Sequence, residues 1–160
     1  MKARFFSIIA LTLASSVAVA TAASAQTPPT DYNYVGLGVG VGDLGDSDLG
    51  LAVNSKFTVG NHVSVRPGLI TDLDFSDDGQ TAFLLPVTYD FNSLTQNGKL
   101  LPYAGGGIAA RTGDDSDVGP LLTAGVDYRV TDKMTLNGAV NWSIYDDSDV
   151  NGVIGVGYTF

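Results

Sequence analysis

The stretch GVIGVGYTF at residues 152–160 decides the fold of this 160-residue chain. Its large apolar side chains, Ile154, Val156, Tyr158 and Phe160, alternate with residues that are mostly small. Because successive side chains of a β-strand point to opposite faces, this period of two predicts a strand with one apolar face. The chain stops on the last aromatic residue of that face.

The beginning of the chain predicts export. Lys2 and Arg4 precede a short apolar stretch at residues 5–13, and small residues follow as far as Ala23-Ser24-Ala25. This is the pattern of a cleavable signal peptide over residues 1–25, so the mature protein is expected to start at Gln26. A single membrane-anchoring helix is the alternative, but the apolar part is short and no stop-transfer charges follow. The chain has no cysteine, which excludes disulfides and a lipid-modified cysteine.

The mature chain repeats the alternation of its last strand. It has no run of about 20 apolar residues and therefore cannot cross a bilayer as helices. Stretches of about ten residues, separated by turn residues, are instead typical of a transmembrane barrel. The predicted strands are residues 32–42, 49–59, 62–72, 81–91, 100–111, 119–130, 134–145 and 152–160. The predicted fold is all-β, an eight-stranded antiparallel up-and-down transmembrane β-barrel with short loops at 32–160, after a short segment at 26–31. The faces of the Gly-rich fifth strand stay unassigned.

The polar character of the second face leaves a soluble, lipocalin-like barrel as an alternative, because periodicity cannot say which face is outside. The signal peptide and the aromatic residues favour the membrane. With an even number of strands both termini lie on the periplasmic side, and aromatic girdles form at the bilayer boundaries. The periplasmic girdle is predicted to hold Tyr32, Tyr34, Phe57, Tyr89, Phe91, Tyr103, Tyr128, Tyr158 and Phe160, and the outer one Phe83, Trp142 and Tyr145. Tyr32 and Tyr34 have the parity of the lumen face, so a bulge or an edge position is expected there.

Three motifs, LPYAGGG at 101–107, AGVDYRVTD at 124–132 and the C-terminal GVGYTF, resemble the OmpA-like transmembrane domain, whose superfamily includes OmpX- and opacity-type surface proteins. The resemblance implies a monomeric outer-membrane protein with a structural or surface-interaction role. It further implies outer-membrane lipid and lipopolysaccharide as surroundings, and periplasmic chaperones during biogenesis. Ile154, Val156, Tyr158 and Phe160 match the C-terminal signal that the barrel-assembly machinery reads.

All 17 acidic residues are Asp, and 13 of them fall in four clusters, one per predicted surface connection. Without the signal peptide, six Lys and Arg face these 17 Asp, a net charge of −11 that disfavours nucleic acid as a partner. Asp with Gly and Ser is turn chemistry, which is the favoured interpretation. The alternative is weak binding of Ca²⁺ or Mg²⁺, since no cluster has EF-hand spacing. The candidate ligands are Asp46, Asp48, Asp77, Asp78, Asp115, Asp117, Asp147 and Asp149.

Charged residues also share the lumen-facing parity. A network that plugs the barrel is the favoured interpretation, because buried charges need partners, and an open ion path is the alternative. Its predicted members are Lys56, Arg66, Asp90, Asp127 and Arg129. Glycines at 36, 38, 40, 155 and 157 are expected to leave room for the long basic side chains.

Catalysis is not expected. The only histidine, His62, follows the Gly60-Asn61 turn, and Ser64 shares its face, but the spacing suggests no general base. No cofactor motif is present in the sequence. The sequence therefore predicts a non-enzymatic protein with a structural or surface-interaction role. A narrow ion channel or porin is the second hypothesis and a lipid-modifying enzyme the third.

Overall fold

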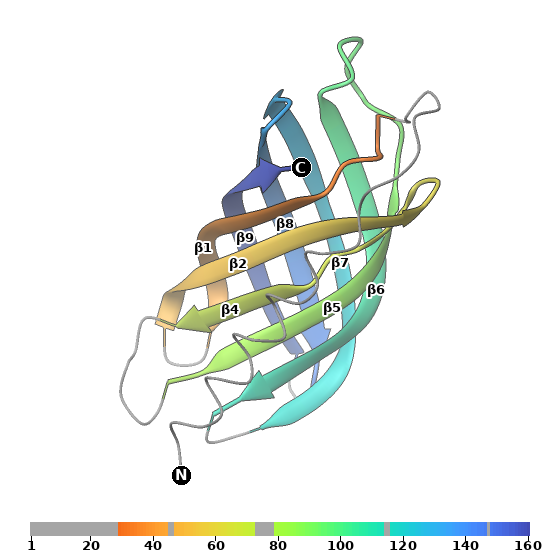
Figure 1. Cartoon of the computed structure of the whole chain (residues 1–160). Helices are drawn as coiled ribbons and strands as arrows, with labels where there is room; N and C mark the ends of the chain where they lie inside the picture. The colour runs from red at the N-terminus through yellow and green to blue at the C-terminus, as the bar shows by residue number, and fades with distance from the viewer. Residues whose placement is uncertain (1–28, 45–46, 73–78, 114–115, 147) are drawn as a thin grey trace.

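A computed structural model describes residues 29–44, 47–72, 79–113, 116–146 and 148–160. The predicted signal peptide lies outside the described residues. The described chain forms one antiparallel sheet that closes on itself into a barrel (Figure 1). No helix long and apolar enough to cross a membrane occurs in this part of the chain.

The barrel has eight strand positions, because two short strands share the third. Each strand pairs antiparallel with its neighbours, and β1 closes the ring on β9, with Leu37 opposite Val156. The strands are β1 Tyr34–Leu44, β2 Ser47–Gly60, β3 Val63–Val65, β4 Gly68–Asp72, β5 Thr81–Asp90, β6 Leu100–Thr112, β7 Asp117–Thr131, β8 Met134–Ile144 and β9 Ser148–Thr159. The predicted all-β, eight-stranded barrel is confirmed.

The third strand position is interrupted at Arg66 and Pro67. The sequence predicted one uninterrupted strand at 62–72, so this break was not predicted. Proline cannot donate to a sheet ladder, and Pro86 of the neighbouring β5 lacks an N–H as well. The Arg66 N–H still donates to the Pro86 carbonyl over 3.0 Å. The Ser55 hydroxyl of β2 donates to the Pro67 carbonyl over 2.6 Å. Both β3 and β4 pair with β2 and β5, so the strand resumes its course after the break.

The large apolar residues face outward, and the polar ones face the lumen. Leu37 and Ile154 are 68% and 72% exposed, whereas Lys56 and Asp127 are fully buried. A soluble barrel would have the reverse arrangement, so the outer surface is suited to lipid. In β6 Ile108 faces outward while Leu101, Tyr103 and Ala109 are buried. This assigns the two faces of the strand that periodicity left open.

Four of the tyrosines predicted for the aromatic girdles lie in the lumen instead. Tyr32, Tyr34, Tyr103 and Tyr145 are at most 9% exposed. Tyr32 and Tyr34 keep the inward parity of β1, and no bulge turns them outward. The girdle prediction is therefore wrong for these four residues. Tyr89, Phe91, Tyr128, Trp142, Tyr158 and Phe160 are exposed on the outer surface, and Phe57 and Phe83 are partly exposed.

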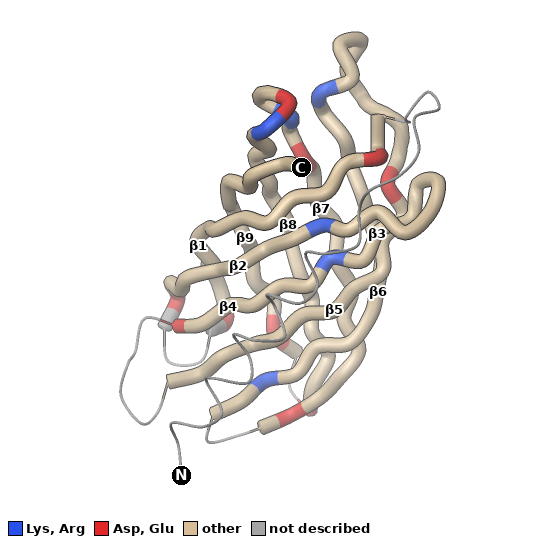
Figure 2. Tube along the Cα trace, viewed as in Figure 1, with Lys and Arg blue, Asp and Glu red and all other residues tan. Residues whose placement is uncertain are grey.

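The two ends of the barrel differ in their connections. One end carries the turn at Asn61 and His62, the connection at 91–99, the turn at 132–133 and the C-terminus. The other end, here called the acidic mouth, carries the connections after β1, β4, β6 and β8 (Figure 1). The described Asp residues in or next to these connections are Asp43, Asp48, Asp72, Asp117, Asp146 and Asp149. In Figure 2 basic positions lie along β2 and between β3 and β4, in the body of the barrel.

Candidate functional site

Arg66 lies at the centre of the lumen and contacts two carboxylates from other strands. Its Nη2 is 2.9 Å from Oδ1 of Asp90, the last residue of β5, and 3.0 Å from Oδ2 of Asp127 in β7. All three side chains are buried. Because β6 lies between β5 and β7 in the sheet, one guanidinium links two strands that are not neighbours.

Lys56 of β2 adds a second cation beside Asp90. Its Nζ lies 3.3 Å from Asp90 Oδ2 and 3.7 Å from the centre of the Tyr32 ring. It also donates to the carbonyl oxygens of Thr30 and Tyr32. Lys56 therefore ties the segment before β1 to the interior of the barrel, at the end opposite the acidic mouth. Two cations and two carboxylates make this cluster electrically balanced.

Neutral donors complete the coordination of Asp127. The hydroxyls of Tyr32 and Tyr34 donate to it over 2.5 and 3.1 Å, and the Asn137 amide donates over 2.6 Å. Burial, and next the negative charge of Asp127, raise the pKa of the Tyr32 phenol above its ordinary value, so the phenol stays a donor. The Tyr103 ring lies 3.4 Å from the Arg66 guanidinium carbon. We call Lys56, Arg66, Asp90 and Asp127, with these partners, the charged layer.

Arg129, the fifth residue of the predicted network, takes a different place. Its guanidinium lies 5.1 Å from the centre of the Tyr32 ring. In the part of the chain that the structure describes, no carboxylate lies within 4.0 Å of it, and its Nε has no hydrogen-bond partner. Arg129 thus flanks the charged layer through an aromatic contact.

The glycines of β1 and β9 make room for neutral side chains. A Cβ on Gly157 would lie 2.6 Å from the Tyr34 ring. One on Gly36 would lie 2.8 Å from Asn54 Oδ1, and one on Gly155 would lie 3.1 Å from the same amide. The sequence led us to expect long Lys and Arg side chains in this space, but Tyr34 and Asn54 occupy it.

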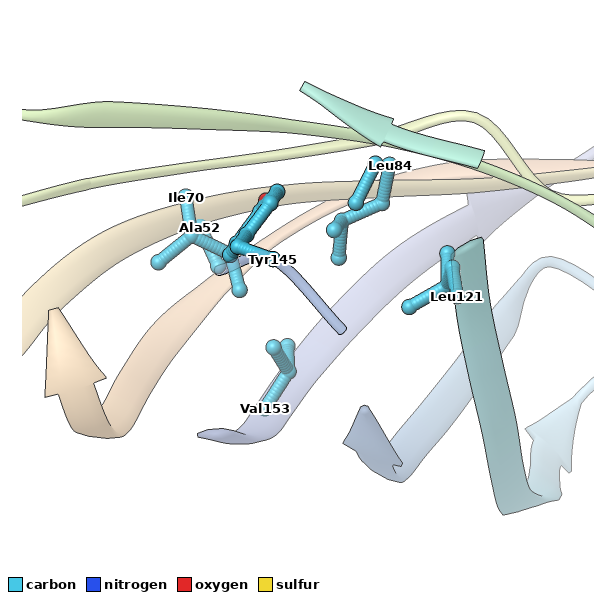
Figure 3. Close-up of a cluster of buried hydrophobic side chains, with 7 residues drawn as sticks. Ala52, Ile70, Leu84, Leu121, Tyr145 and Val153 are labelled. Atoms are coloured by element: carbon cyan, nitrogen blue, oxygen red, sulfur yellow. The ribbon is translucent and has the colours of Figure 1, made fainter. Parts of the chain in front are cut away.

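A second group of buried side chains, here called the apolar layer, lies in the lumen on the acidic-mouth side of the charged layer. Figure 3 shows this group in close-up. Its members are Ala52, Ile70, Leu84, Ala109, Leu121, Tyr145 and Val153. Ile70, Leu84 and Val153 line a cavity of about 40 Å³ that reaches Arg66 and Tyr103. A cavity of about 20 Å³ lies on the other side, against Ile70 and Tyr145. Each is large enough for only a few waters. Of these seven residues, the sequence carried an expectation only for Tyr145, which was predicted for the outer girdle.

No family model matches the chain, and no curated protein matches it. Solved structures do. The N-terminal β-barrel domain of OprF from Pseudomonas aeruginosa is 14% identical, with 81% of this chain and 96% of that chain covered and a TM-score of 0.62. OprG from Pseudomonas aeruginosa is 15% identical over 86% of this chain and 99% of that chain, with a TM-score of 0.61. A de novo designed transmembrane β-barrel is 17% identical over 86% and 100%, with a TM-score of 0.60.

The chain has the fold of the small outer-membrane β-barrels. At this level of identity the likeness describes the fold alone.

Three of the six described Asp residues at the acidic mouth of this outer-membrane barrel fold, Asp43, Asp72 and Asp117, accept hydrogen bonds from backbone N–H groups. Asp43 accepts from Val150 N–H over 3.3 Å, and Asp72 accepts from Gln80 N–H over 2.8 Å. Asp117 accepts from the N–H groups of Val118 and Asp146. The short Asp side chain reaches such backbone groups, which gives a physical reason for the absence of Glu.

Of the predicted metal ligands, Asp48 is exposed and Asp117 caps backbone groups, while Asp149 pairs with Arg111 at 2.8 Å. The others, Asp46, Asp77, Asp78, Asp115 and Asp147, lie outside the described residues. Within the described ranges, His and Asp side chains form no group of three that could hold a metal ion.

His62 and Ser64 of the barrel point to separate partners. His62 Nδ1 lies 2.7 Å from the Asp90 carbonyl oxygen, and its ring stacks on Tyr89. The Ser64 hydroxyl donates to the Asp90 carboxylate. Both side chains therefore support the position of Asp90, and neither contact is that of a nucleophile with its base.

Proposed function

We propose that the protein is an integral outer-membrane barrel with a closed lumen and a non-enzymatic, structural or surface-interaction role. The observation that carries the closed lumen is the position of Arg66, within 3.0 Å of carboxylates on two different walls. In this proposal the bridge across the barrel interrupts the water-filled path. Outer-membrane lipid and lipopolysaccharide are the proposed surroundings of the apolar outer surface.

Energetics support this reading. Removing one partner from a buried ion pair typically costs about 3–5 kcal/mol, so the arrangement with the ion pairs formed is strongly favoured over one in which they are broken. The apolar layer forms a second barrier, since hydrophobic constrictions exclude water and ions. The charged layer and the apolar layer are two barriers of different chemistry in series, and together they support a closed lumen.

A narrow ion channel is the second candidate. It is favoured by buried polar atoms that have no hydrogen-bond partner among the described residues, Asn54 Oδ1 and Arg129 Nε, because such atoms call for internal water. Water on one side of the apolar layer would shorten the distance that an ion has to cross without hydration.

Single-channel recording in planar bilayers distinguishes a closed barrel from an ion channel. The purified wild-type protein is expected to give no discrete conductance steps, because the charged and apolar layers each block the lumen. Variants that replace the exposed loop residue Asn97 serve as the preparation control, and their traces should match the wild type. Reproducible unitary steps that scale with the amount of reconstituted protein would favour the channel.

We further propose that the acidic mouth faces the cell exterior. The chain has no native cysteine, so Ser116→Cys, Ser148→Cys and Asn97→Cys each carry a single thiol at an exposed position. On intact cells an impermeant maleimide should label the first two, which lie at the acidic mouth, and not the third, which lies at the opposite end. Labelling of Asn97→Cys alone would reverse the orientation.

Assembly is proposed to depend on the outward-facing residues of β9 and on Phe160. Phe160 is exposed to the lipid side, and its N–H donates to the Asn33 carbonyl over 3.0 Å. Phe160→Asp should sharply reduce the amount of heat-modifiable folded barrel in the outer-membrane fraction. Leu94→Asp, at an exposed loop position, is the control for surface charge. Equal amounts of folded protein for both variants would argue against recognition of the terminal residue.

A further inference from the structure

The segment before β1, residues 30–33 and here called the strap, leaves the barrel wall and enters the lumen. The register of β1 on β2, continued by two residues, would place Tyr32 opposite Thr58. Instead the Tyr32 N–H donates to the Thr30 carbonyl over 3.1 Å, and the Asn33 side chain accepts the Thr58 N–H over 2.8 Å. Thr30 and Tyr32 are only 2% and 5% exposed, so the chain turns inward before β1 begins. In Figure 1 the strap is the red-orange start of the coloured chain, at the end opposite the acidic mouth.

The backbone of the strap surrounds the Lys56 ammonium. Lys56 Nζ donates to the carbonyl oxygens of Thr30 and Tyr32, the second over 3.0 Å. The Thr58 hydroxyl lies within hydrogen-bond distance of the same two oxygens, at 3.4 and 3.1 Å. Hydrogen bonds from a charged donor are stronger than those between neutral groups. The buried cation of β2 therefore holds the strap in the lumen.

The Tyr32 side chain anchors the strap from the inside. Its ring lies 3.7 Å from Lys56 Nζ and 5.1 Å from the Arg129 guanidinium carbon, and it stacks on the Tyr34 ring. Its hydroxyl donates to the Asp127 carboxylate over 2.5 Å. Cations within about 6 Å of an aromatic ring are attracted to its face. One side chain of the strap thus contacts a cation of β2 and a carboxylate of β7.

The outer side of the strap is in contact with solvent. Asp31 is exposed, and a groove of about 200 Å³ lies beside it, lined also by Thr58 and Asn61. Among the described residues, the ion pairs join side chains of the barrel, and none includes the strap. Moving the strap outward therefore breaks hydrogen bonds and aromatic contacts but leaves these ion pairs and the sheet intact.

We propose that the strap is a displaceable lid that closes the lumen at the end opposite the acidic mouth. When it is docked, it covers Lys56 and Asp127, which are fully buried. When it is displaced, water reaches these two side chains from that end while the strands stay paired. This goes beyond the closed lumen proposed above, because closure at this end then depends on a segment outside the sheet and has two states.

Amine labelling of the folded protein in detergent micelles tests the lid. Peptide mass spectrometry gives the rate at which a small amine-reactive reagent modifies Lys56, relative to the exposed Lys133 of the same molecule. Reaction at a buried group follows the population of the open state. Tyr32→Ala removes a hydrogen bond to a charged group and should raise the Lys56 rate about tenfold or more. Asp31→Ala, at an exposed position of the same segment, should stay within about twofold of the wild type.

A cross-link separates displacement of the lid from simple loss of the Tyr32 ring. The chain has no native cysteine, so Asp31→Cys and Asn61→Cys, which line the same groove, can be joined by a bifunctional maleimide. In the Tyr32→Ala background the cross-link should return the Lys56 rate towards the wild-type value, because it holds the strap against the barrel. The same protein treated with a monofunctional maleimide is the control. Equal Lys56 rates in the two preparations would overturn the lid.

Thr58→Val keeps the test decisive if Tyr32→Ala does not fold. Valine keeps most of the volume but removes the hydroxyl beside the strap carbonyls, so the Lys56 rate should rise, by less than in Tyr32→Ala. A wild-type Lys56 that reacts as fast as Lys133 would overturn the lid, as would a rate that Asp31→Ala raises as much as Tyr32→Ala. Conductance steps from a wild type whose Lys56 stays protected would contradict the closed lumen and leave the lid in place.

Discussion

Arg66→Gln is expected to lower the free energy of unfolding by about 3–5 kcal/mol, the typical cost of breaking a buried ion pair from one side. Arg66 is the cation closest to both lumenal carboxylates, at 2.9 and 3.0 Å, so its loss leaves Asp127 without any ion-pair partner among the described residues. Gln keeps much of the volume and can still donate to one carboxylate. Urea unfolding in micelles, followed by the fluorescence of the only tryptophan, Trp142, measures the change.

Lys133→Gln is the matched control for this charge change. Lys133 is exposed in the turn between β7 and β8, and exposed charges contribute little to stability. Its replacement should change the free energy of unfolding by no more than about 0.5 kcal/mol. Similar free energies of unfolding for both variants would mean that Arg66 is hydrated like a surface residue. This result would support the ion-path hypothesis.

Gly157→Ala is expected to destabilise the barrel by about 1–3 kcal/mol, the usual cost of overpacking. The added Cβ would lie 2.6 Å from Cδ2 and 3.1 Å from Cγ of Tyr34. The ring cannot simply turn away, because its hydroxyl donates to Asp127 over 3.1 Å. The same urea titration, together with the yield of folded protein, measures the effect.

Gly138→Ala in the neighbouring strand β8 provides the comparison. A Cβ at this position meets no atom within 4 Å. This replacement should be neutral or slightly stabilising, since alanine loses less conformational freedom than glycine on folding. If both alanine variants behaved alike, the space beside Tyr34 would not be as tight as the distances indicate.

The barrel itself could be predicted from the sequence because the period-two pattern reports directly on which face of a strand is buried. The predicted strand at 134–145 and the observed β8 Met134–Ile144 differ by one residue. The break at Arg66 and Pro67 was missed because the side-chain alternation continues through it. Pro67 lies in the gap between β3 and β4, and the register places Pro86 of β5 opposite Arg66, so two neighbouring ladder N–H groups are absent at this point.

The sequence could predict which residues line the lumen, but not which of them contact one another. Inward parity put Arg66, Asp90 and Asp127 on one face, and all three are buried, but Arg66 and Asp127 are 61 residues apart in sequence. Which of them meet depends on the depth of each strand in the barrel, which a single sequence does not contain. Tyr34 was placed in the lipid boundary because the aromatic preference was given more weight than its parity.

A double-mutant cycle on Arg66 and Asp127 tests most directly whether paired charges fill and close the lumen. The free energy of unfolding is measured for the wild type, Arg66→Gln, Asp127→Asn and the double variant. If the two side chains form one desolvated pair, the double variant should cost less than the sum of the single variants, by about 1–3 kcal/mol. A coupling close to zero would show that each charge is solvated independently, and would contradict the closed lumen.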